Sequence, residues 1–267
     1  MTAGSGPYEA LGFETADGVA RITLSRPDAA NAMSPGMCRE LFDAAVACDE
    51  RDDIRAVLLT GAGKMFSAGG DLRFFKEQGD ALGAALKAMT ADLHAAIATF
   101  ARMDAPVVCA VNGMAAGAGF SLAAACDYVI AGASARFTLA YTAAGLSPDG
   151  SATWFLPRLV GLRRARELML TNRMLSAEEA REMGIVDRVV ADEALMEEAS
   201  KQAALFAVGP TKAFGATKRL LQETWANGLE TQTDRESRSI AGLSRTDDAK
   251  EGIDAFLAKR RPDFKGR

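Results

Sequence analysis

Two glycine-rich segments carry the residue pattern that most suggests chemistry. The first spans residues 66–71 (Phe-Ser-Ala-Gly-Gly-Asp) and the second spans residues 112–119 (Asn-Gly-Met-Ala-Ala-Gly-Ala-Gly). Each follows a short apolar run of strand character and leads into a helix-like stretch. A glycine turn between a strand and a helix leaves backbone N–H groups free to point into a pocket. Two such donors converging on one carbonyl oxygen would form an oxyanion hole. Glycines also simply permit tight turns, but two segments in the same context favour the chemical interpretation.

The elements expected to position these turns begin with a hairpin. Residues 9–15 and 19–24 have strand character and are joined by Asp17-Gly18, a strong hairpin signal. Ser34 followed by Pro35 predicts the start of a helix that runs to about residue 49. Further strands are predicted at 55–60, 106–111, 127–131, 136–138 and 186–190, and further helices at 81–103, 151–158, 162–170 and 176–183.

Beyond about residue 191 the pattern is helical only. Helices are predicted at 192–207, 211–226, 228–242 and 247–260. Mixed strands and helices followed by helices alone predict an α/β core over residues 1–206 and a helical C-terminal region over residues 207–267. The apolar faces of such helices must be buried against the core or against a neighbouring subunit.

Composition restricts the range of functions. A net charge of −4, from 31 basic and 35 acidic residues, argues against nucleic acid as a partner. The four cysteines lack metal-ligand spacing and fit a reduced, cytoplasmic protein. No signal segment and no apolar run near the ~20 residues that span a bilayer are evident, so we expect no membrane association. No nucleotide-binding glycine fingerprint occurs, and we expect no metal and no redox cofactor.

Several motifs together resemble one enzyme family. They are Arg26-Pro27 with Asn31-Ala32, the segments 66–71 and 110–119, Cys126-Asp127, and the segment 256–260. In this order they resemble the enoyl-CoA hydratase/isomerase (crotonase) superfamily over nearly the whole chain. The resemblance implies a crotonase-like α/β spiral of ββα repeats, a C-terminal helical trimerisation region, and a homotrimer or a dimer of trimers. It also implies an acyl-CoA substrate, with coenzyme A as part of the thioester rather than a separate cofactor.

The resemblance assigns roles to individual residues. The backbone N–H groups of Gly70 and Ala118 would hold the thioester oxygen while it gains negative charge as an enolate. Segments at Ala29-Ala30, Ala68 and Asp71-Leu72 match stretches that line the pantetheine and adenine sites, and Lys259 resembles a lysine that reaches coenzyme A across a subunit interface. The complete set of expected binding residues is Arg26, Ala29, Ala30, Ala68, Gly69, Asp71, Leu72, Gly117, Ser121, Tyr141, Phe256 and Lys259.

The acidic residues bear on which reaction is catalysed. Hydratases of this family activate water with two glutamates, and the matching positions here hold Ser121 and Tyr141. Neither is a carboxylate, so two-glutamate hydration is disfavoured. The chain instead has Asp149, at the position of the acidic residue in the family's isomerases and of the nucleophile in its 4-chlorobenzoyl-CoA dehalogenases. By itself Pro-Asp-Gly would be a turn whose aspartate caps the next helix; the paired glycine turns favour the catalytic interpretation.

The favoured mechanism uses Asp149 as a proton shuttle. The carboxylate would remove a proton from one carbon of a fatty or aromatic acyl-CoA and return it two carbons away, while the oxyanion hole stabilises the dienolate. Residues 145–158 and 251–260 resemble the family's epoxyphenylacetyl-CoA isomerases in particular.

Three alternatives stay open. The first is a dehalogenase-like reaction, in which Asp149 would attack an aromatic carbon and displace halide, and His94, the single histidine, would activate water to hydrolyse the ester. Against this, Tyr141 replaces the tryptophan that positions the aspartate in those enzymes, and His94 is also explained as an incidental polar residue on the helix at 81–103. The second is an enoyl-CoA hydratase, and the third is a non-catalytic acyl-CoA-binding protein.

Overall fold

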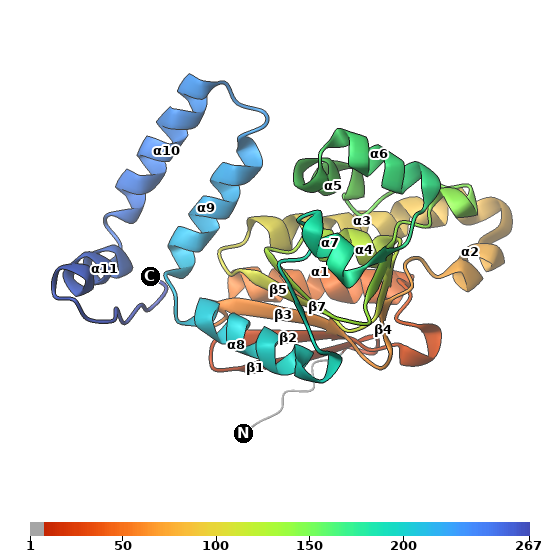
Figure 1. Ribbon diagram of the computed structural model, residues 1–267, viewed down its shortest axis with the longest axis horizontal. Coiled ribbons are helices and arrows are strands. Elements are labelled where there is room, and N and C mark those ends of the chain that lie inside the picture. Colours follow the sequence, from red (N-terminus) through yellow and green to blue (C-terminus); the bar gives the residue numbers. More distant parts are fainter. Residues whose placement is uncertain (1–7) are drawn as a thin grey trace.

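A six-stranded sheet lies at the centre of the molecule. The computed structural model describes residues 8–267 (Figure 1), so the first seven residues of the predicted core lie outside the described part. The sheet order is β1-β2-β3-β5-β7-β10; β1 and β2 are antiparallel and the other neighbours are parallel. The strands are β1 (Leu11–Ala16), β2 (Val19–Leu24), β3 (Ala56–Gly61), β5 (Val107–Val111), β7 (Tyr128–Gly132) and β10 (Arg188–Val190).

The predicted N-terminal hairpin is confirmed. Strands β1 and β2 are joined by Asp17 and Gly18, whose φ angles are +51° and +78°. Two consecutive positive φ angles give the two-residue turn whose twist matches that of paired strands, and Asp-Gly adopts it readily. The hairpin places β2 against β3, next to the strand that leads into the first glycine turn.

A second sheet of four short strands is largely absent from the sequence-based prediction. Its order is β4-β6-β8-β9, and its strands are β4 (Met65–Ser67), β6 (Met114–Ala116), β8 (Arg136–Thr138) and β9 (Leu175–Ser176). Of these, only β8 is among the predicted strands. Strands β4 and β6 lie in or beside the two glycine-rich segments, so a second short strand precedes Gly69 and Gly117. The pairs β3/β4, β5/β6 and β7/β8 each give one strand to each sheet, which produces the ββα repeats that the resemblance implied.

Helices cover both faces of the six-stranded sheet. Helices α1 (Pro35–Glu50) and α3 (Leu82–Arg102) pack together on one face, and α8 (Leu195–Ala207) covers the other. Strands β3 and β5 are buried along their whole length, which explains their continuous apolar sequences. Helix α1 begins as predicted, with the Ser34 hydroxyl accepting a hydrogen bond from the Met37 N–H at 3.2 Å.

Shorter helices surround the second sheet. They are α2 (Leu72–Gln78), α4 (Ala118–Ala124), α5 (Ala152–Val160), α6 (Leu162–Thr171) and α7 (Ala177–Glu182), with 3₁₀ turns at Pro27–Ala29, Gly79–Ala81, Thr142–Ala144 and Asp192–Ala194. Helix α2 is not among the predicted elements, although its first residue follows an aspartate. Asp71 is the N-cap and accepts a hydrogen bond from the Phe74 N–H at 3.3 Å.

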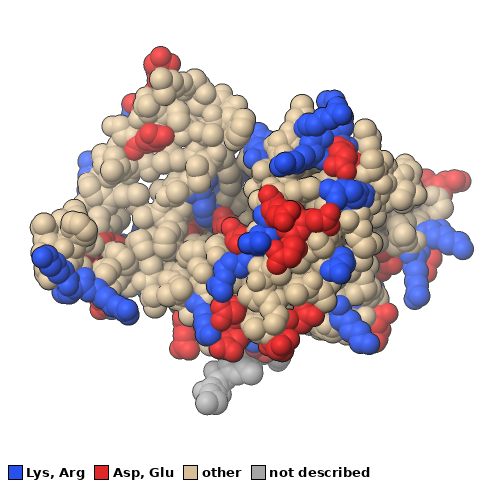
Figure 2. Space-filling view, in the orientation of Figure 1, with Lys and Arg blue, Asp and Glu red and all other residues tan. Residues whose placement is uncertain are grey.

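The C-terminal helices extend away from the α/β region (Figure 1). They are α9 (Thr211–Glu223), α10 (Leu229–Leu243) and α11 (Asp247–Leu257). Helix α11 ends before residue 260, the predicted end, because Lys259 has a left-handed φ of +53°. Much of this region is uncharged on the face in Figure 2, and its exposed large apolar side chains include Trp225, Leu229, Ile240, Ile253, Phe256 and Leu257. The domain division at residue 207 stays a prediction.

Two further observations concern the cysteines and the lengths of the helices. The four cysteines are free thiols, and Cys109 is fully buried in the core, as expected for a small apolar residue. Within residues 8–267, no helix is both long enough and apolar enough to cross a membrane.

Helix α9 is attached to the core through the C-terminal end of α3. The Lys218 Nζ donates to the carbonyl oxygens of Phe100 (2.9 Å) and Ala105 (3.1 Å) and pairs with Asp127 at 2.7 Å. Its side chain is only 10% exposed. The last carbonyls of a helix have no partner within the helix, so a cation from another segment both satisfies them and complements the helix dipole.

We predict that Lys218→Met lowers the free energy of unfolding by about 1.5–3 kcal/mol, because two carbonyls and a carboxylate lose their shared charged donor. Urea denaturation measures the change. The matched control is Lys212→Met, which removes an exposed lysine from the same helix and should have a much smaller effect. Equal loss of stability in both variants would show that the contact contributes nothing specific.

Candidate functional site

The two glycine turns touch one another. A Cβ atom added at Gly69 would lie 2.8 Å from the Ala116 carbonyl oxygen and 3.2 Å from the Gly117 Cα, so no side chain fits there. Gly69 and Gly117 also have φ angles of +89° and +50°, which strain residues that carry a Cβ. Glycine is therefore required at position 69 by both space and backbone conformation, and is favoured at position 117 by backbone conformation alone.

Each turn carries a free amide on a residue that lines a cavity. The amides flanking Gly70 are used: Gly69 N–H donates to the Ser67 hydroxyl at 3.2 Å, and Asp71 N–H donates to the Met33 carbonyl at 3.0 Å. Gly70 and Ala118 are different, since within residues 8–267 their N–H groups donate no hydrogen bond. Ala118 opens helix α4, where the first N–H groups have no partner in the helix.

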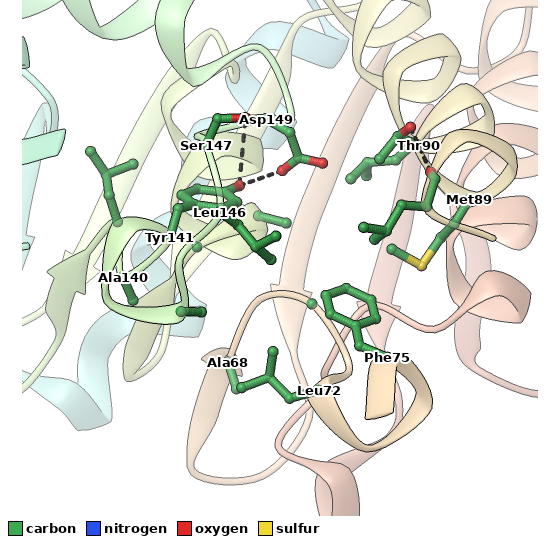
Figure 3. A pocket seen from close by; sticks show the side chains of 17 residues that line it. Ala68, Leu72, Phe75, Met89, Thr90, Ala140, Tyr141, Leu146, Ser147 and Asp149 are labelled. Atoms are coloured by element: carbon green, nitrogen blue, oxygen red, sulfur yellow. Dashed lines mark hydrogen bonds between the residues drawn. The ribbon is translucent and has the colours of Figure 1, made fainter. Parts of the chain in front are cut away.

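Both free amides belong to residues that line one cavity of about 260 Å³ (Figure 3). Helix α3 contributes one wall, largely apolar, through Leu86, Met89 and Leu93 together with the hydroxyl-bearing Thr90. The loop that ends at Asp149 contributes the opposite wall. Of the predicted site residues, those that line this cavity are Ala68, Gly70, Leu72, Gly117, Ala118, Tyr141 and Asp149. Backbone donors and one carboxylate therefore share a small, mostly apolar space.

The Asp149 carboxylate is held by Tyr141. The Tyr141 hydroxyl donates to Asp149 Oδ1 at 2.6 Å and lies 3.4 Å from the Asp149 carbonyl oxygen (Figure 3). Burial, and then the neighbouring carboxylate, raise the pKa of Tyr141 above that of a free phenol, so the hydroxyl stays protonated and acts as a donor. The carboxylate therefore bonds to Tyr141 rather than capping the next helix, whose N-cap is Ser151 without a side-chain cap.

Ser121 connects this pair to the second glycine turn. Its hydroxyl lies 3.0 Å from the Tyr141 hydroxyl and 3.2 Å from the Gly117 carbonyl oxygen. Ser121 is fully buried and does not line the cavity itself. The two positions that resemble the hydratase glutamates are thus adjacent in space, but neither supplies a carboxylate.

His94 reaches the same loop from helix α3. Its Nε2 accepts a hydrogen bond from the Gly150 N–H at 3.1 Å and lies 3.8 Å from Asp149 Oδ2. The interpretation of His94 as an incidental polar residue of the helix is therefore incomplete. The chain brings its single histidine next to the one carboxylate of the cavity.

A second cavity of about 630 Å³ adjoins the first and shares Ala68, Gly70 and Leu72 with it. The predicted binding residues Arg26, Ala29, Ala30 and Asp71 line it. Arg26 holds this region together: its guanidinium donates to the Ala32 carbonyl at 2.6 Å and pairs with Asp71 at 3.1 Å. The two cavities together offer an extended site with a polar outer part and an apolar inner part.

Four predicted binding residues lie outside both cavities, and Ser121, described above, is one of them. Gly69 supports the contact between the turns, whereas Phe256 and Lys259 lie in and just after α11 in the C-terminal region. The Phe256 side chain is 83% exposed. One chain alone therefore does not bring Phe256 or Lys259 to the site, and their expected role across a subunit interface stays a prediction.

Sequence reasoning assigned no role in the site to two residues that contribute to it, Phe75 and Asn31. The Phe75 ring of α2 lies over Gly70, where an added Cβ would come within 2.6 Å of the ring. Fully buried Asn31, with a φ of +52°, donates to the carbonyls of Ala62 (2.8 Å) and Met65 (2.7 Å) and so ties the loop of the second cavity to the first glycine turn. The Asp71 cap could have revealed α2, but no local signal identifies the Asn31 contacts.

Among residues 8–267 there is no group of three or more His, Cys, Asp or Glu side chains placed to hold a metal ion.

Comparison with known proteins identifies relatives over nearly the whole chain. A family model described as enoyl-CoA hydratase/isomerase matches residues 14–267. The chain is 41% identical to the 1,2-epoxyphenylacetyl-CoA isomerase of Escherichia coli (strain K12) over 94% of this chain and 96% of that protein. It is 36% identical to the 4-chlorobenzoyl coenzyme A dehalogenase-2 of Arthrobacter sp, over 86% and 84% respectively.

The fold has equally clear counterparts. The crystal structure of an enoyl-CoA hydratase from Polaromonas sp. JS666 superimposes with a TM-score of 0.91 at 32% identity, covering 96% of this chain and all of that one. The relatives thus carry isomerase, dehalogenase and hydratase names on one scaffold. The family match over residues 14–267, together with these identities and the shared two-sheet fold, shows that the chain belongs to the enoyl-CoA hydratase/isomerase (crotonase) family.

Proposed function

We propose that this protein is an acyl-CoA isomerase in which Asp149 carries the proton. The observation that supports this most directly is that Asp149 is the single carboxylate among the residues lining the cavity that also contains Gly70 and Ala118. A reaction that moves one proton between two carbons needs one base, whereas hydration needs two groups to deliver hydroxide and a proton to different carbons.

The thioester oxygen would accept hydrogen bonds from the Gly70 and Ala118 amides. Asp149 would take a proton from the carbon next to the thioester carbonyl, and the electron pair released would move onto the oxygen and the adjacent double bond as a dienolate. The protonated carboxyl would then return the proton to the carbon two positions farther along. No atom is gained or lost, and the amides stabilise the charge where it develops.

The two oxygens of Asp149 have different roles in this mechanism. Oδ1 accepts the hydrogen bond from Tyr141, so Oδ2 is the oxygen left to take the substrate proton. In Figure 3 the second carboxylate oxygen points into the space between the Asp149 loop and the wall that carries Thr90. Tyr141 would orient the carboxylate without competing as a base, because burial keeps the phenol protonated.

The remaining predicted binding residues fit a thioester that extends outward. The acyl group would occupy the apolar inner cavity, and the pantetheine arm would follow the second cavity past Ala29 and Ala30. Lys259 and Phe256 would complete the coenzyme A site from a neighbouring subunit of a trimer or a dimer of trimers. The exposed apolar side chains of α10 and α11 support burial of this region against another subunit.

A dehalogenase-like reaction is the second candidate, and one distance favours it. His94 Nε2 lies 3.8 Å from Asp149 Oδ2, within reach of a water that could hydrolyse an aspartyl ester. The 36% identity to an Arthrobacter 4-chlorobenzoyl coenzyme A dehalogenase points the same way. The greater similarity to the isomerase of Escherichia coli, at 41%, supports the first candidate.

A panel of thioesters tests the proposal. Purified protein is incubated separately with a 3-enoyl-CoA, a 2-enoyl-CoA and 4-chlorobenzoyl-CoA, and products are followed by ultraviolet spectrum, mass and chloride release. We expect conversion of the 3-enoyl to the conjugated 2-enoyl thioester. Rapid hydration of the 2-enoyl thioester would instead identify a hydratase, and chloride release would identify a dehalogenase. No turnover of any thioester would favour a binding protein.

The Asp149→Asn variant should lose about 10²–10⁴-fold in turnover, because the amide cannot accept the proton. Binding of the thioester, measured by calorimetry, should remain. Asp80→Asn, in an exposed 3₁₀ turn, is the matched control and should turn over substrate like the unaltered protein. Full activity of Asp149→Asn would remove this residue from the mechanism.

The Ala118→Pro variant deletes one backbone donor. Proline is tolerated at the first position of a helix, so α4 should still form. We expect kcat to fall by about 10²–10³-fold, the usual effect of losing one oxyanion donor. The kcat of Ala118→Gly, which keeps the N–H group, should stay within about fivefold of that of the unaltered protein. Similar rates for the two variants would argue against a donor at this position.

The Tyr141→Phe variant tests the orientation of the carboxylate. Loss of a hydrogen bond to a charged group should lower kcat by about tenfold while KM changes little, because the phenol does not carry the proton. Tyr128→Phe, at the start of β7 and against Phe206, is the control and should be unaffected. A loss as large as that of Asp149→Asn would instead indicate that Tyr141 takes part in proton transfer.

A further inference from the structure

His94 and Gly150 form a contact that the proposed reaction does not use. The Gly150 N–H donates to His94 Nε2 at 3.1 Å. A ring nitrogen that accepts a hydrogen bond carries no proton, so the imidazole is neutral and its proton is on Nδ1. This contact therefore specifies both a charge state and a tautomer for the single histidine of the chain.

Gly150 has little freedom to find another partner. It is buried, its φ is +59°, and an added Cβ would meet the Ser121 Cβ at 2.9 Å. The turn is thus packed against α4 on one side, while its amide depends on α3 on the other. A buried N–H group without an acceptor disfavours the conformation that buries it.

Asp149 is consequently held from two directions. Tyr141 bonds to Oδ1 and lies near the Asp149 carbonyl oxygen, and His94 bonds to the amide that follows in the chain. Oδ2 has no hydrogen-bond donor within residues 8–267 and lies 3.8 Å from His94 Nε2. An unprotonated Nε2 cannot donate to Oδ2, which leaves this oxygen open to the substrate.

We propose that His94 is a positioning residue that acts through the Gly150 amide, as a neutral Nδ1–H imidazole, and that it carries no proton in the reaction. Its effect on turnover rests on the proposed isomerase function, whereas its tautomer does not. Protonation of His94 would remove the acceptor for Gly150 and would turn Nε2 into a donor facing Asp149 Oδ2. Both changes would make Oδ2, the oxygen that accepts the substrate proton, less available to the substrate.

Among the titratable groups near His94, Asp149 is the one whose interaction depends on the charge of the imidazole, because the others are paired or stay neutral. Asp92, two residues earlier on α3, pairs with Arg39 of α1 at 3.6 Å. Cys38 of α1 is buried, and burial together with the nearby carboxylates of Asp149 and Asp92 raises the pKa of its thiol to about 12, so the thiol stays neutral. Tyr141, on the far side of Asp149, is held protonated. The charge state of the imidazole therefore determines whether Asp149 Oδ2 faces an unprotonated ring nitrogen or a hydrogen-bond donor.

Nuclear magnetic resonance of [¹⁵N]histidine-labelled full-length protein tests the tautomer directly. With one histidine in the chain, the signals need no assignment. We expect a protonated Nδ1 and an unprotonated Nε2 at slightly alkaline pH, the reverse of the tautomer that free histidine prefers. A protonated Nε2 would overturn the proposal. This result does not depend on any enzymatic activity, so it is separable from failure of the proposed function.

Two substitutions then test the effect on catalysis. The Gln side chain of His94→Gln can accept the Gly150 N–H through its amide oxygen but cannot relay a proton, whereas His94→Leu can do neither. We expect kcat for the favoured thioester to stay within about fivefold in His94→Gln and to fall by roughly tenfold or more in His94→Leu, with KM little changed in both. Equal inactivity of the two variants would show that His94 carries a proton.

The separate effects on kcat and KM distinguish positioning from a general packing role, because a packing defect around the cavity would change both constants. Melting curves identify any variant that fails to fold, and the resonance experiment remains decisive in that case.

Discussion

The contact between the two glycine turns is the constraint on which the site depends. The parallel pairing of β4 with β6 brings the turns side by side, and glycine at positions 69 and 117 lets their backbones meet. Around this contact the N–H groups of Gly69, Asp71 and Gly117 donate to other protein groups, whereas those of Gly70 and Ala118 stay free on residues that line the inner cavity. Donors of this kind are part of the backbone and cannot rotate away, so they need no reorganisation when charge develops nearby.

The same contact also links the donors to the acid. Gly117 is joined through Ser121 to Tyr141, and Tyr141 is joined to Asp149, so one chain of hydrogen bonds runs from the second turn to the carboxylate. From the opposite wall, His94 holds the amide next to Asp149. The distance between the free amides and the carboxylate is thus set by helices α3 and α4 rather than by a flexible loop alone. The geometry of the site is therefore a property of the packed core.

The sequence alone predicted the elements that depend on interactions between residues close together in the chain. The hairpin follows from Asp17-Gly18, and helix α1 follows from Ser34-Pro35 and its apolar spacing, since turn and cap chemistry act within a few residues. Strands β4, β6 and β9 were missed because they exist only through pairing between distant segments. The apolar residues of α3 that line the cavity have the same helical spacing as those of α3 in the core, so periodicity cannot separate them. The hydrogen bonds that hold Asp149 are likewise tertiary, and only the family resemblance indicated this residue.

The number and surroundings of the carboxylates explain how one scaffold can host different reactions. Activation of water by two acids requires two carboxyl groups facing the same volume, whereas the positions that resemble the hydratase glutamates hold Ser121 and Tyr141, which bond to each other instead. The carboxylate that remains has one oxygen fixed by a phenol that stays protonated and one oxygen facing the substrate volume. Such an arrangement can take up one proton and give it back, but the described residues that line the cavity include no second carboxylate to activate water. If the proposed function holds, the reaction would change with the side chains around Asp149, while the two glycine turns would keep the shared step of stabilising a thioester enolate.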